Sequence, residues 1–264
     1  MRTREESGDD IAQLSLIMLD VGGVFRDSSE AISEGYKRCF ESLKLDYGLK
    51  TEDVWHLIGV GKYGSMAVAL KAIVAVSRTN VNLSEIMKKT DPEPALDELV
   101  RNNIKSSEGQ MLSSLMDRVF WPYWESDDAK SKITVFPFAK EAVQNFKNSR
   151  YTVGIFTNAS RATVKRDLAP IGLENFTYIV TEEDVQNKKP DGEGIKRPIQ
   201  DMGLQPHEAM YIGDSAIDVS AARDAGCIST VVLTGMGTRN YLETREPDFM
   251  FNNLLDASKF FQRA

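Results

Sequence analysis

The stretch AMYIGDSAIDVSAARDAGCISTVVL (209–233) contains the pattern that decides the fold. It begins with a short apolar run, AMYIG (209–213), and ends with a second one, ISTVVL (228–233). Residues 216–225, between these runs, have the pattern of a helix. A strand, a helix and another strand in this order predict two parallel strands joined by a crossover helix.

The same alternation of strands and helices begins at about residue 135. TVGIF (152–156) and TYIVT (177–181) predict further buried strands, with helical patterns at 139–148, 161–168 and 194–202. The earlier apolar run LSLIML (14–19) predicts one more strand, buried on both faces. This alternation is typical of an α/β fold, in which helices cover both faces of a parallel sheet. We therefore expect a Rossmann-like parallel-sheet core.

A long helical segment separates the first predicted strand from the others. Its apolar residues recur at three- and four-residue steps, as in Ile32, Tyr36, Phe40 and Leu43. We therefore expect an inserted α-helical cap domain. The expected boundaries are a polar N-terminal tail at 1–13, a Rossmann-like core at 14–30 and 134–264, and a helical cap at 31–133.

The composition of the 264 residues narrows the classes of function. The net charge of −7 argues against nucleic-acid binding, which depends on an excess of lysine and arginine. Two cysteines, Cys39 and Cys227, cannot form a disulfide framework, so we expect a cytoplasmic protein. The first apolar run is too short to cross a bilayer, which predicts no membrane association.

Polar residues follow several predicted strands. Ligands of open parallel sheets bind at the carboxyl ends of strands. Asp20, Thr157-Asn158 and Asp214 lie at such ends, and Lys189 lies in a connecting segment. A carboxylate can attack phosphorus, while hydroxyl, amide and ammonium groups hold phosphoryl oxygens. Grouped carboxylates suit Mg²⁺, which prefers oxygen ligands. The pattern indicates a phosphate site.

Four motifs in this order resemble those of the haloacid dehalogenase-like superfamily, in its phosphoglycolate phosphatase and β-phosphoglucomutase-like branch with a helical cap. They are LDVGGVFRDS (19–28), FTNAS (156–160), Lys189-Pro190 and GDSAIDVSAARDAG (213–226). The last motif is the most specific, because two acids at fixed spacing lie within a long matching frame. The resemblance implies a phosphoric monoester hydrolase that acts on a small phosphorylated metabolite and uses Mg²⁺.

The resemblance also implies roles for individual residues. Asp20 is expected to be the nucleophile, supported by Thr157 and Lys189 as catalytic groups. The expected ligands of Mg²⁺ are Asp20, the carbonyl group of Gly22, Asp214 and Asp218. The residues expected to contact the substrate are Asn158, Gly23 and Lys62.

One departure from the family pattern concerns catalysis. The family usually has a general acid two residues after the nucleophile, where this chain has Gly22. General acid–base catalysis contributes about 10²–10⁴-fold to a rate. Its loss matters most for poor leaving groups such as alkoxides. The chain is therefore expected to be a phosphatase with a relocated acid, a phosphatase of good leaving groups, or an impaired homologue that binds a ligand or partner. Asp27 is the nearest acid for such a relocation.

The same departure leaves a second reaction open. Phosphonoacetaldehyde hydrolases also lack this aspartate and use a lysine of the cap to form an imine during cleavage of a C–P bond. The segment IGVGKY (58–63) resembles the segment of that lysine, which makes Lys62 a candidate. Lys189-Pro190 argues against this alternative, because that family has arginine before the proline.

Overall fold

The structure is a computed structural model that describes residues 12–262. The tail predicted at 1–13 therefore lies, up to residue 11, outside the described residues. The chain forms two compact units. The first contains residues up to Asp27, Val135–Gly235 and residues from Arg245 onward, and the second contains Ser28–Thr134 and Met236–Thr244.

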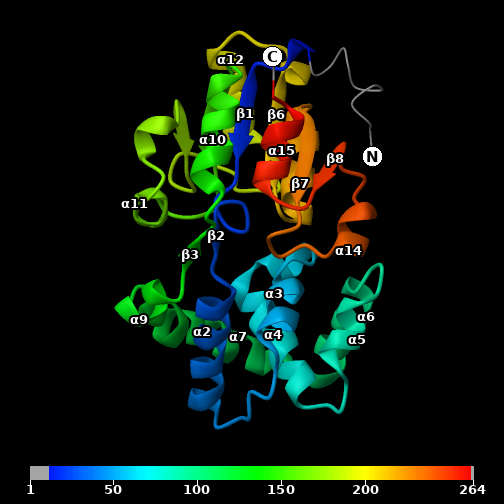
Figure 1. The fold of residues 1–264 in the computed structure, drawn as a ribbon. Helices are drawn as coiled ribbons and strands as arrows, with labels where there is room; N and C mark the ends of the chain where they lie inside the picture. Colours follow the sequence, from blue (N-terminus) through cyan, green and yellow to red (C-terminus); the bar gives the residue numbers. More distant parts are fainter. Residues whose placement is uncertain (1–11, 263–264) are drawn as a thin grey trace. The chain divides into compact units, whose positions relative to one another are not determined.

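The first unit is built on a six-stranded parallel sheet with the strand order β5-β4-β1-β6-β7-β8 (Figure 1). The strands are β1 (Leu16–Leu19), β4 (Thr152–Phe156), β5 (Tyr178–Val180), β6 (Ala209–Gly213), β7 (Ile228–Val232) and β8 (Phe249–Phe251). The central strand β1 pairs with both β4 and β6, so the carboxyl ends of these three strands lie side by side.

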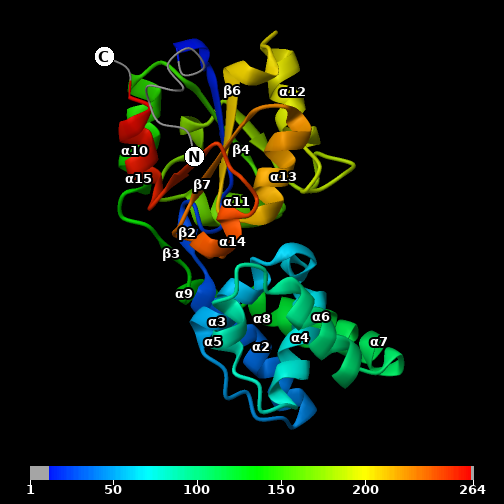
Figure 2. The same ribbon diagram turned by 90° about the vertical axis from the view of Figure 1, so that its right-hand side faces the viewer.

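Helices cover both faces of this sheet. In Figure 2, α10 and α15 lie on one side of the strands, while α12 and α13 lie on the other. The helices of this unit are α10 (Ala139–Asn148), α11 (Arg161–Leu168), α12 (Glu193–Asp201), α13 (Ala216–Ala225) and α15 (Leu254–Phe260), with short 3-10 turns at Leu173–Asn175 and Pro206–Glu208.

The position of β1 between two layers of helices explains why its apolar run is continuous. Ile17 and Leu19 point into the core cluster shared with α10, α11 and α15. Leu16 and Met18 point into the opposite cluster, shared with α12 and α13. All four side chains are fully buried. Because successive strand residues face opposite sides, a strand covered on both faces needs apolar residues at every position.

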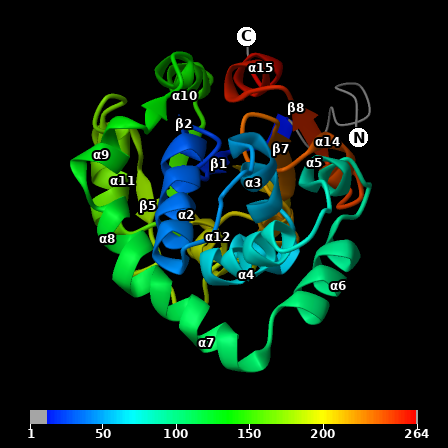
Figure 3. The ribbon, with the colours of Figure 1, turned by 90° about the horizontal axis from the view of Figure 1, so that it is seen from below.

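The second unit is helical (Figure 3). Its helices are α2 (Ser29–Leu43), α3 (Thr51–Ile58), α4 (Met66–Ser77), α5 (Leu83–Met87), α6 (Glu93–Asn103), α7 (Ser106–Leu115), α8 (Trp121–Trp124), α9 (Asp127–Ser131) and α14 (Arg239–Glu243), with a 3-10 turn at Gly61–Gly64 and a π-helical turn at Met116–Phe120. The segment Met236–Thr244, which the sequence analysis places in the core, groups with this unit. Its Met236 carbonyl oxygen lies 3.0 Å from Nδ1 of His56 in α3.

Two short strands lie where the chain passes between the units. β2 (Arg26–Asp27) and β3 (Thr134–Val135) form a two-stranded sheet of their own. The chain therefore leaves the first unit and returns to it at neighbouring points. This is the connectivity of an insertion, in which a whole domain replaces a loop.

The predicted fold class is confirmed, because the core is a Rossmann-like parallel sheet accompanied by a helical domain. Besides the short helix α14, two C-terminal elements, β8 and α15, were not predicted. Both are short, and their aromatic residues Phe249, Phe251 and Phe260 contact one another rather than forming a clear period along the sequence. Among residues 12–262, no helix is long and apolar enough to cross a membrane.

Candidate active site

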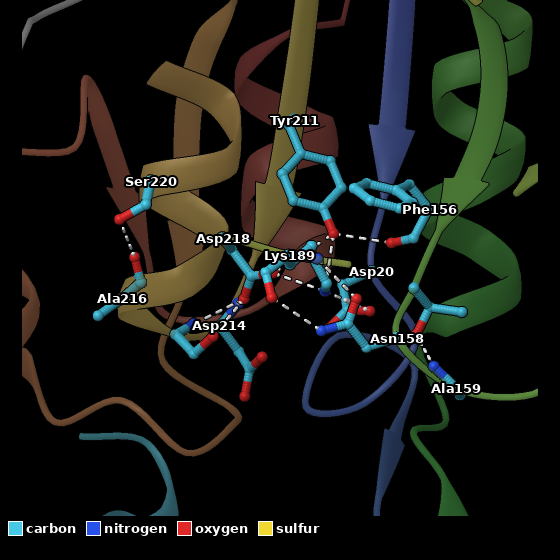
Figure 4. A network of polar contacts seen from close by, with 12 residues as sticks. Asp20, Phe156, Asn158, Ala159, Lys189, Tyr211, Asp214, Ala216, Asp218 and Ser220 are labelled. Carbon is cyan, nitrogen blue, oxygen red and sulfur yellow. Dashed lines mark hydrogen bonds and ion pairs between the residues drawn. The ribbon is translucent and has the colours of Figure 1, made fainter. Parts of the chain in front are cut away.

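The polar residues predicted to form the site follow three adjacent strands. Asp20 comes directly after β1, Thr157 after β4, and Asp214 after β6. The backbone N–H of Asp20 donates to the carbonyl oxygen of Ile212 at 2.9 Å, which continues the pairing of β1 with β6. The strand pairing therefore places these residues at the same edge of the sheet, where Figure 4 shows Asp20 and Asp214.

A buried lysine joins two of the carboxylates. Nζ of Lys189 lies 3.0 Å from Oδ1 of Asp20 and 2.7 Å from Oδ1 of Asp218. The Lys189 residue is only 6% exposed, whereas the side chain of the neighbouring Lys188 is 56% exposed and pairs with Glu182. Of the two adjacent lysines, Lys189 is thus the one that enters the site.

Asp218 caps the start of α13 in addition to contacting Lys189. Its Oδ2 accepts hydrogen bonds from the backbone N–H groups of Asp214 and Ser215 and from the Ser215 hydroxyl, at 3.1, 3.0 and 2.6 Å. Ser215 and Asp218 form the capping box of this helix. Both oxygens of Asp218 therefore accept bonds within the protein, which fixes the carboxylate relative to Lys189.

Burial and charge have opposing effects on these ionisable groups. Burial raises the pKa of the Asp20 carboxyl above its ordinary value, although the Lys189 ammonium partly opposes the rise. Burial acts in the same direction on Asp218, but there the ammonium and several hydrogen bonds dominate, and the pKa is lowered. The Lys189 pKa is raised, because attraction to both carboxylates outweighs its burial. The ammonium form of Lys189 is therefore strongly favoured.

Asp214 completes a group of three buried carboxylates. Asp20, Asp214 and Asp218 each offer an oxygen within 4.8 Å of the others. Asp214 is fully buried and lies against Gly23, where an added Cβ atom would overlap its carboxylate. Gly23 also has a φ of +67°, a conformation that favours glycine. Hard oxygen donors at this spacing fit a divalent cation such as Mg²⁺.

Gly22 differs from Gly23 in the space around it. A Cβ atom built on Gly22 meets no heavy atom within 4 Å. Its φ lies outside the left-handed range that makes side chains unfavourable. The backbone at this position can therefore accept a side chain, and the glycine leaves open space two residues after Asp20.

Thr157 and Asn158 differ in their contacts. Oγ1 of Thr157 accepts a hydrogen bond from the N–H of Ala159 at 3.3 Å. The Asn158 side chain bonds both polar groups of the Lys189 backbone: Oδ1 accepts from its N–H at 2.9 Å, and Nδ2 donates to its carbonyl oxygen at 3.2 Å. Asn158, expected to contact the substrate, thus holds the segment that carries Lys189.

Lys62 lies in the second unit, in the 3-10 turn Gly61–Gly64. Its Nζ donates to Asp97 at 2.7 Å, and the hydroxyl of Tyr63 also donates to Asp97 at 2.7 Å. The Lys62 side chain is 54% exposed. Its ammonium therefore belongs to a partly exposed polar cluster within that unit.

One residue of the site was missed by the sequence analysis. Tyr211 in β6 places its hydroxyl 3.0 Å from Nζ of Lys189. The sequence shows it as one apolar member of a buried strand. The available signal was its hydroxyl, because a buried tyrosine usually needs a hydrogen-bond partner.

Part of the sequence is similar to known pyrophosphatases. The chain is 36% identical to Pyrophosphatase PpaX of Bacillus cereus (strain AH820) over 117 residues, which is 44% of this chain and 54% of that protein. It is similar, to the same extent, to Pyrophosphatase PpaX of Bacillus anthracis. The chain thus spans about half the length of the curated relatives it matches.

Solved structures share the fold over most of the chain. A protein described as a predicted phosphoglycolate phosphatase from Haemophilus somnus has a TM-score of 0.65 at 18% identity, covering 95% of this chain and 99% of its own. A haloacid dehalogenase-like family hydrolase from Streptococcus pneumoniae has a TM-score of 0.65 at 17% identity, with 95% and 100% covered. The model of haloacid dehalogenase-like hydrolases matches residues 68–232, more than half of the sequence. This chain is a member of the haloacid dehalogenase-like hydrolase family.

Proposed function

We propose that the chain is a Mg²⁺-dependent phosphatase that hydrolyses a small phosphorylated metabolite through an aspartyl-phosphate on Asp20. The observation that carries this proposal is the contact of Asp20 with the Lys189 ammonium beside Asp214 and Asp218. The names of the similar proteins, which include a pyrophosphatase and a predicted phosphoglycolate phosphatase, support phosphate chemistry in general.

In the proposed reaction, a carboxylate oxygen of Asp20 forms a bond to phosphorus while the bond from phosphorus to the leaving oxygen breaks. Lys189 holds the carboxylate and compensates charge on the phosphoryl oxygens, and Thr157 donates its hydroxyl to one of them. Water then attacks the acyl phosphate, which releases inorganic phosphate and restores Asp20. The Asp20, Asp214 and Asp218 carboxylates and the Gly22 carbonyl are the proposed Mg²⁺ ligands. The cation, when bound, offsets the repulsion between an anionic nucleophile and an anionic substrate.

The open space at Gly22 limits the proposed substrates. No side chain at that position can give a proton to the departing oxygen. Phosphate esters or anhydrides whose leaving group is stable as an anion are therefore favoured over alkyl esters. Both cysteines are free and buried, as is usual in a reducing compartment, which supports the cytoplasm as the proposed location.

The test is release of phosphate from 4-nitrophenyl phosphate with Mg²⁺, compared with EDTA, for the wild type and Asp20→Asn. We expect turnover that both EDTA and Asp20→Asn abolish. An inactive wild type that still binds Mg²⁺ would contradict the phosphatase and favour a homologue that binds a ligand without turnover.

A further inference from the structure

The hydroxyl of Tyr211 makes contacts in a buried part of the site that no proposed catalytic role uses. Tyr211 is fully buried. Its Oη lies 2.7 Å from the carbonyl oxygen of Phe156 and 3.0 Å from Nζ of Lys189 (Figure 4). A hydroxyl has one hydrogen and two lone pairs. The hydroxyl has two acceptors, the Phe156 carbonyl oxygen at 2.7 Å and Oδ1 of Asp218 at 3.3 Å, and its hydrogen is directed mainly to the nearer one, while a lone pair accepts from Lys189.

This lone pair completes the surroundings of the lysine. An ammonium carries three hydrogens. Within the described part of the chain, Nζ of Lys189 donates hydrogen bonds to Asp218 and Tyr211 and forms an ion pair with Oδ1 of Asp20 at 3.0 Å. Two of these three partners are carboxylates and one is a neutral hydroxyl. Because the contacts lie with three different residues, the ammonium cannot turn without weakening at least one of them.

The contact of Tyr211 with Phe156 connects two parts of the proposed machinery. Phe156 is the last residue of β4, and Thr157 follows it directly. The hydroxyl therefore ties the strand that ends at Thr157 to the lysine that contacts Asp20. The rings of Tyr211 and Phe156 also lie beside the ammonium, with centroids 5.5 and 5.9 Å from Nζ.

We propose that Tyr211 is a positioning residue, which orients Lys189 toward Asp20 for attack on phosphorus. This inference rests on the proposed function and adds to it a residue that acts only through the lysine. Without the hydroxyl, one ammonium hydrogen loses its acceptor. The ammonium is then free to move toward Asp218, which is already its nearer partner. Asp20 would lose part of its support although every proposed metal ligand remains.

The experiment compares Tyr211→Phe with Tyr151→Phe. Tyr151 is also a buried tyrosine of the first unit, and its hydroxyl donates to the carbonyl oxygen of Phe261 at 2.8 Å. It packs in the core cluster on the other face of the sheet from Tyr211. Because both variants lose one buried hydroxyl, Tyr151→Phe controls for the effect of lost stability in Tyr211→Phe. The measurements are kcat and KM for 4-nitrophenyl phosphate, the half-saturating Mg²⁺ concentration and Tm.

We expect Tyr211→Phe to lower kcat about tenfold, because a misplaced catalytic group is costly to the reacting step. Its KM and half-saturating Mg²⁺ concentration should stay within about twofold of the wild type, because no binding group is removed. Tyr151→Phe should retain the wild-type kcat while losing a similar amount of Tm. An unchanged kcat in Tyr211→Phe, or an equal loss in both variants, would overturn the proposal.

A second measurement separates this inference from the proposed function. If the wild type releases no phosphate, the proposed function fails, and Tyr211 is judged by acetylation of Lys189 relative to Lys188 with acetic anhydride, followed by mass spectrometry. We expect the ratio to rise about fivefold in Tyr211→Phe, as the loss of one net hydrogen bond implies, and to stay constant in Tyr151→Phe. A constant ratio in both variants would show that the hydroxyl does not hold the lysine.

Discussion

Oδ1 of Asp20 and Nζ of Lys189 lie 3.0 Å apart, and both side chains are at least nine-tenths buried. The ammonium is also shared with Asp218. Removing a buried charge leaves its partners uncompensated, which costs about 3–5 kcal/mol. A buried lysine at this place therefore supports both the fold and the proposed reaction.

Lys189→Met is expected to lower the free energy of unfolding by about 3–5 kcal/mol, since it leaves two buried carboxylates without their cation. It should also reduce phosphate release by about 10²–10³-fold. Urea denaturation and turnover of 4-nitrophenyl phosphate measure the two effects. Lys188→Met, at the exposed neighbouring lysine, is the control and should stay close to wild type in both.

Gly22→Asp is expected to add the missing proton donor, because its side chain enters open space. Turnover of an alkyl phosphate should rise by about 10²-fold, while turnover of an aryl phosphate should change little, because a phenolate leaves without a proton. Rates over a series of leaving groups measure the change in sensitivity. Gly22→Ala should keep the wild-type sensitivity. Equal turnover of alkyl and aryl phosphates by the wild type would contradict a restriction to good leaving groups.

Gly23→Ala is expected to weaken the proposed metal site. The added methyl group overlaps the Asp214 carboxylate, and φ at this position is unfavourable for alanine. The half-saturating Mg²⁺ concentration should rise by about tenfold or more, since displacing one ligand costs more than about 1.4 kcal/mol. Gly22→Ala adds the same methyl group at the preceding residue without overlap. If both variants respond to Mg²⁺ equally, the contact with Asp214 does not govern the metal site.

The alternative reaction, cleavage of a C–P bond, can be tested at Lys62. Its ammonium is bonded to Asp97, whereas an imine forms only from a free amine. We expect borohydride with phosphonoacetaldehyde to leave Lys62 unmodified, as judged by mass spectrometry. Lys62→Arg keeps a positive charge but cannot form an imine, and it should retain the release of phosphate from aryl phosphates. A reduced adduct at Lys62 would instead establish the imine chemistry.

The two thiols are expected to react slowly in the folded protein. Burial raises the pKa of both Cys39 and Cys227 from 9.0 to about 12, so about a thousandfold less thiolate is present near pH 8. A chromogenic disulfide should therefore label two thiols rapidly only in denaturant. Because the folded form keeps protons that the unfolded chain releases, the thiols also make stability fall as pH rises from about 9 to 12. Rapid labelling of the native protein at pH 8 would contradict this.

The sheet could be predicted from sequence because its strands are buried on both faces. Continuous apolar runs such as β1 and β4 give a strong local signal, and the predicted ranges of α10, α11 and α13 agree with the structure. The short edge strand β8 has three residues, of which only Phe249 is fully buried. Its pattern is correspondingly weak.

The carboxylates of the site could be identified from the sequence, whereas the hydrogen bonds that support Lys189 could not. Asp20, Lys189, Asp214 and Asp218 come together as the motif order predicts, although their roles remain proposals. The amide of Asn158 is bonded to the Lys189 backbone, a contact between segments 31 residues apart that was not predicted, while its contact with the substrate stays a prediction. Tyr211 was missed for the same reason. Such contacts depend on which strands become neighbours, which local patterns do not specify.

The place of β1 in the middle of the sheet has a consequence for how the chain folds during synthesis. This strand precedes the other strands of the sheet in the sequence, and both of its partners, β4 and β6, lie more than a hundred residues later. Contacts of such long range slow folding, because a large loop must close before they form. The inserted helices can form from local contacts during the time in which β1 has no strand to pair with. In this topology β1 is synthesised before either of its partner strands, so its apolar residues stay unpaired until β4 and then β6 have been made.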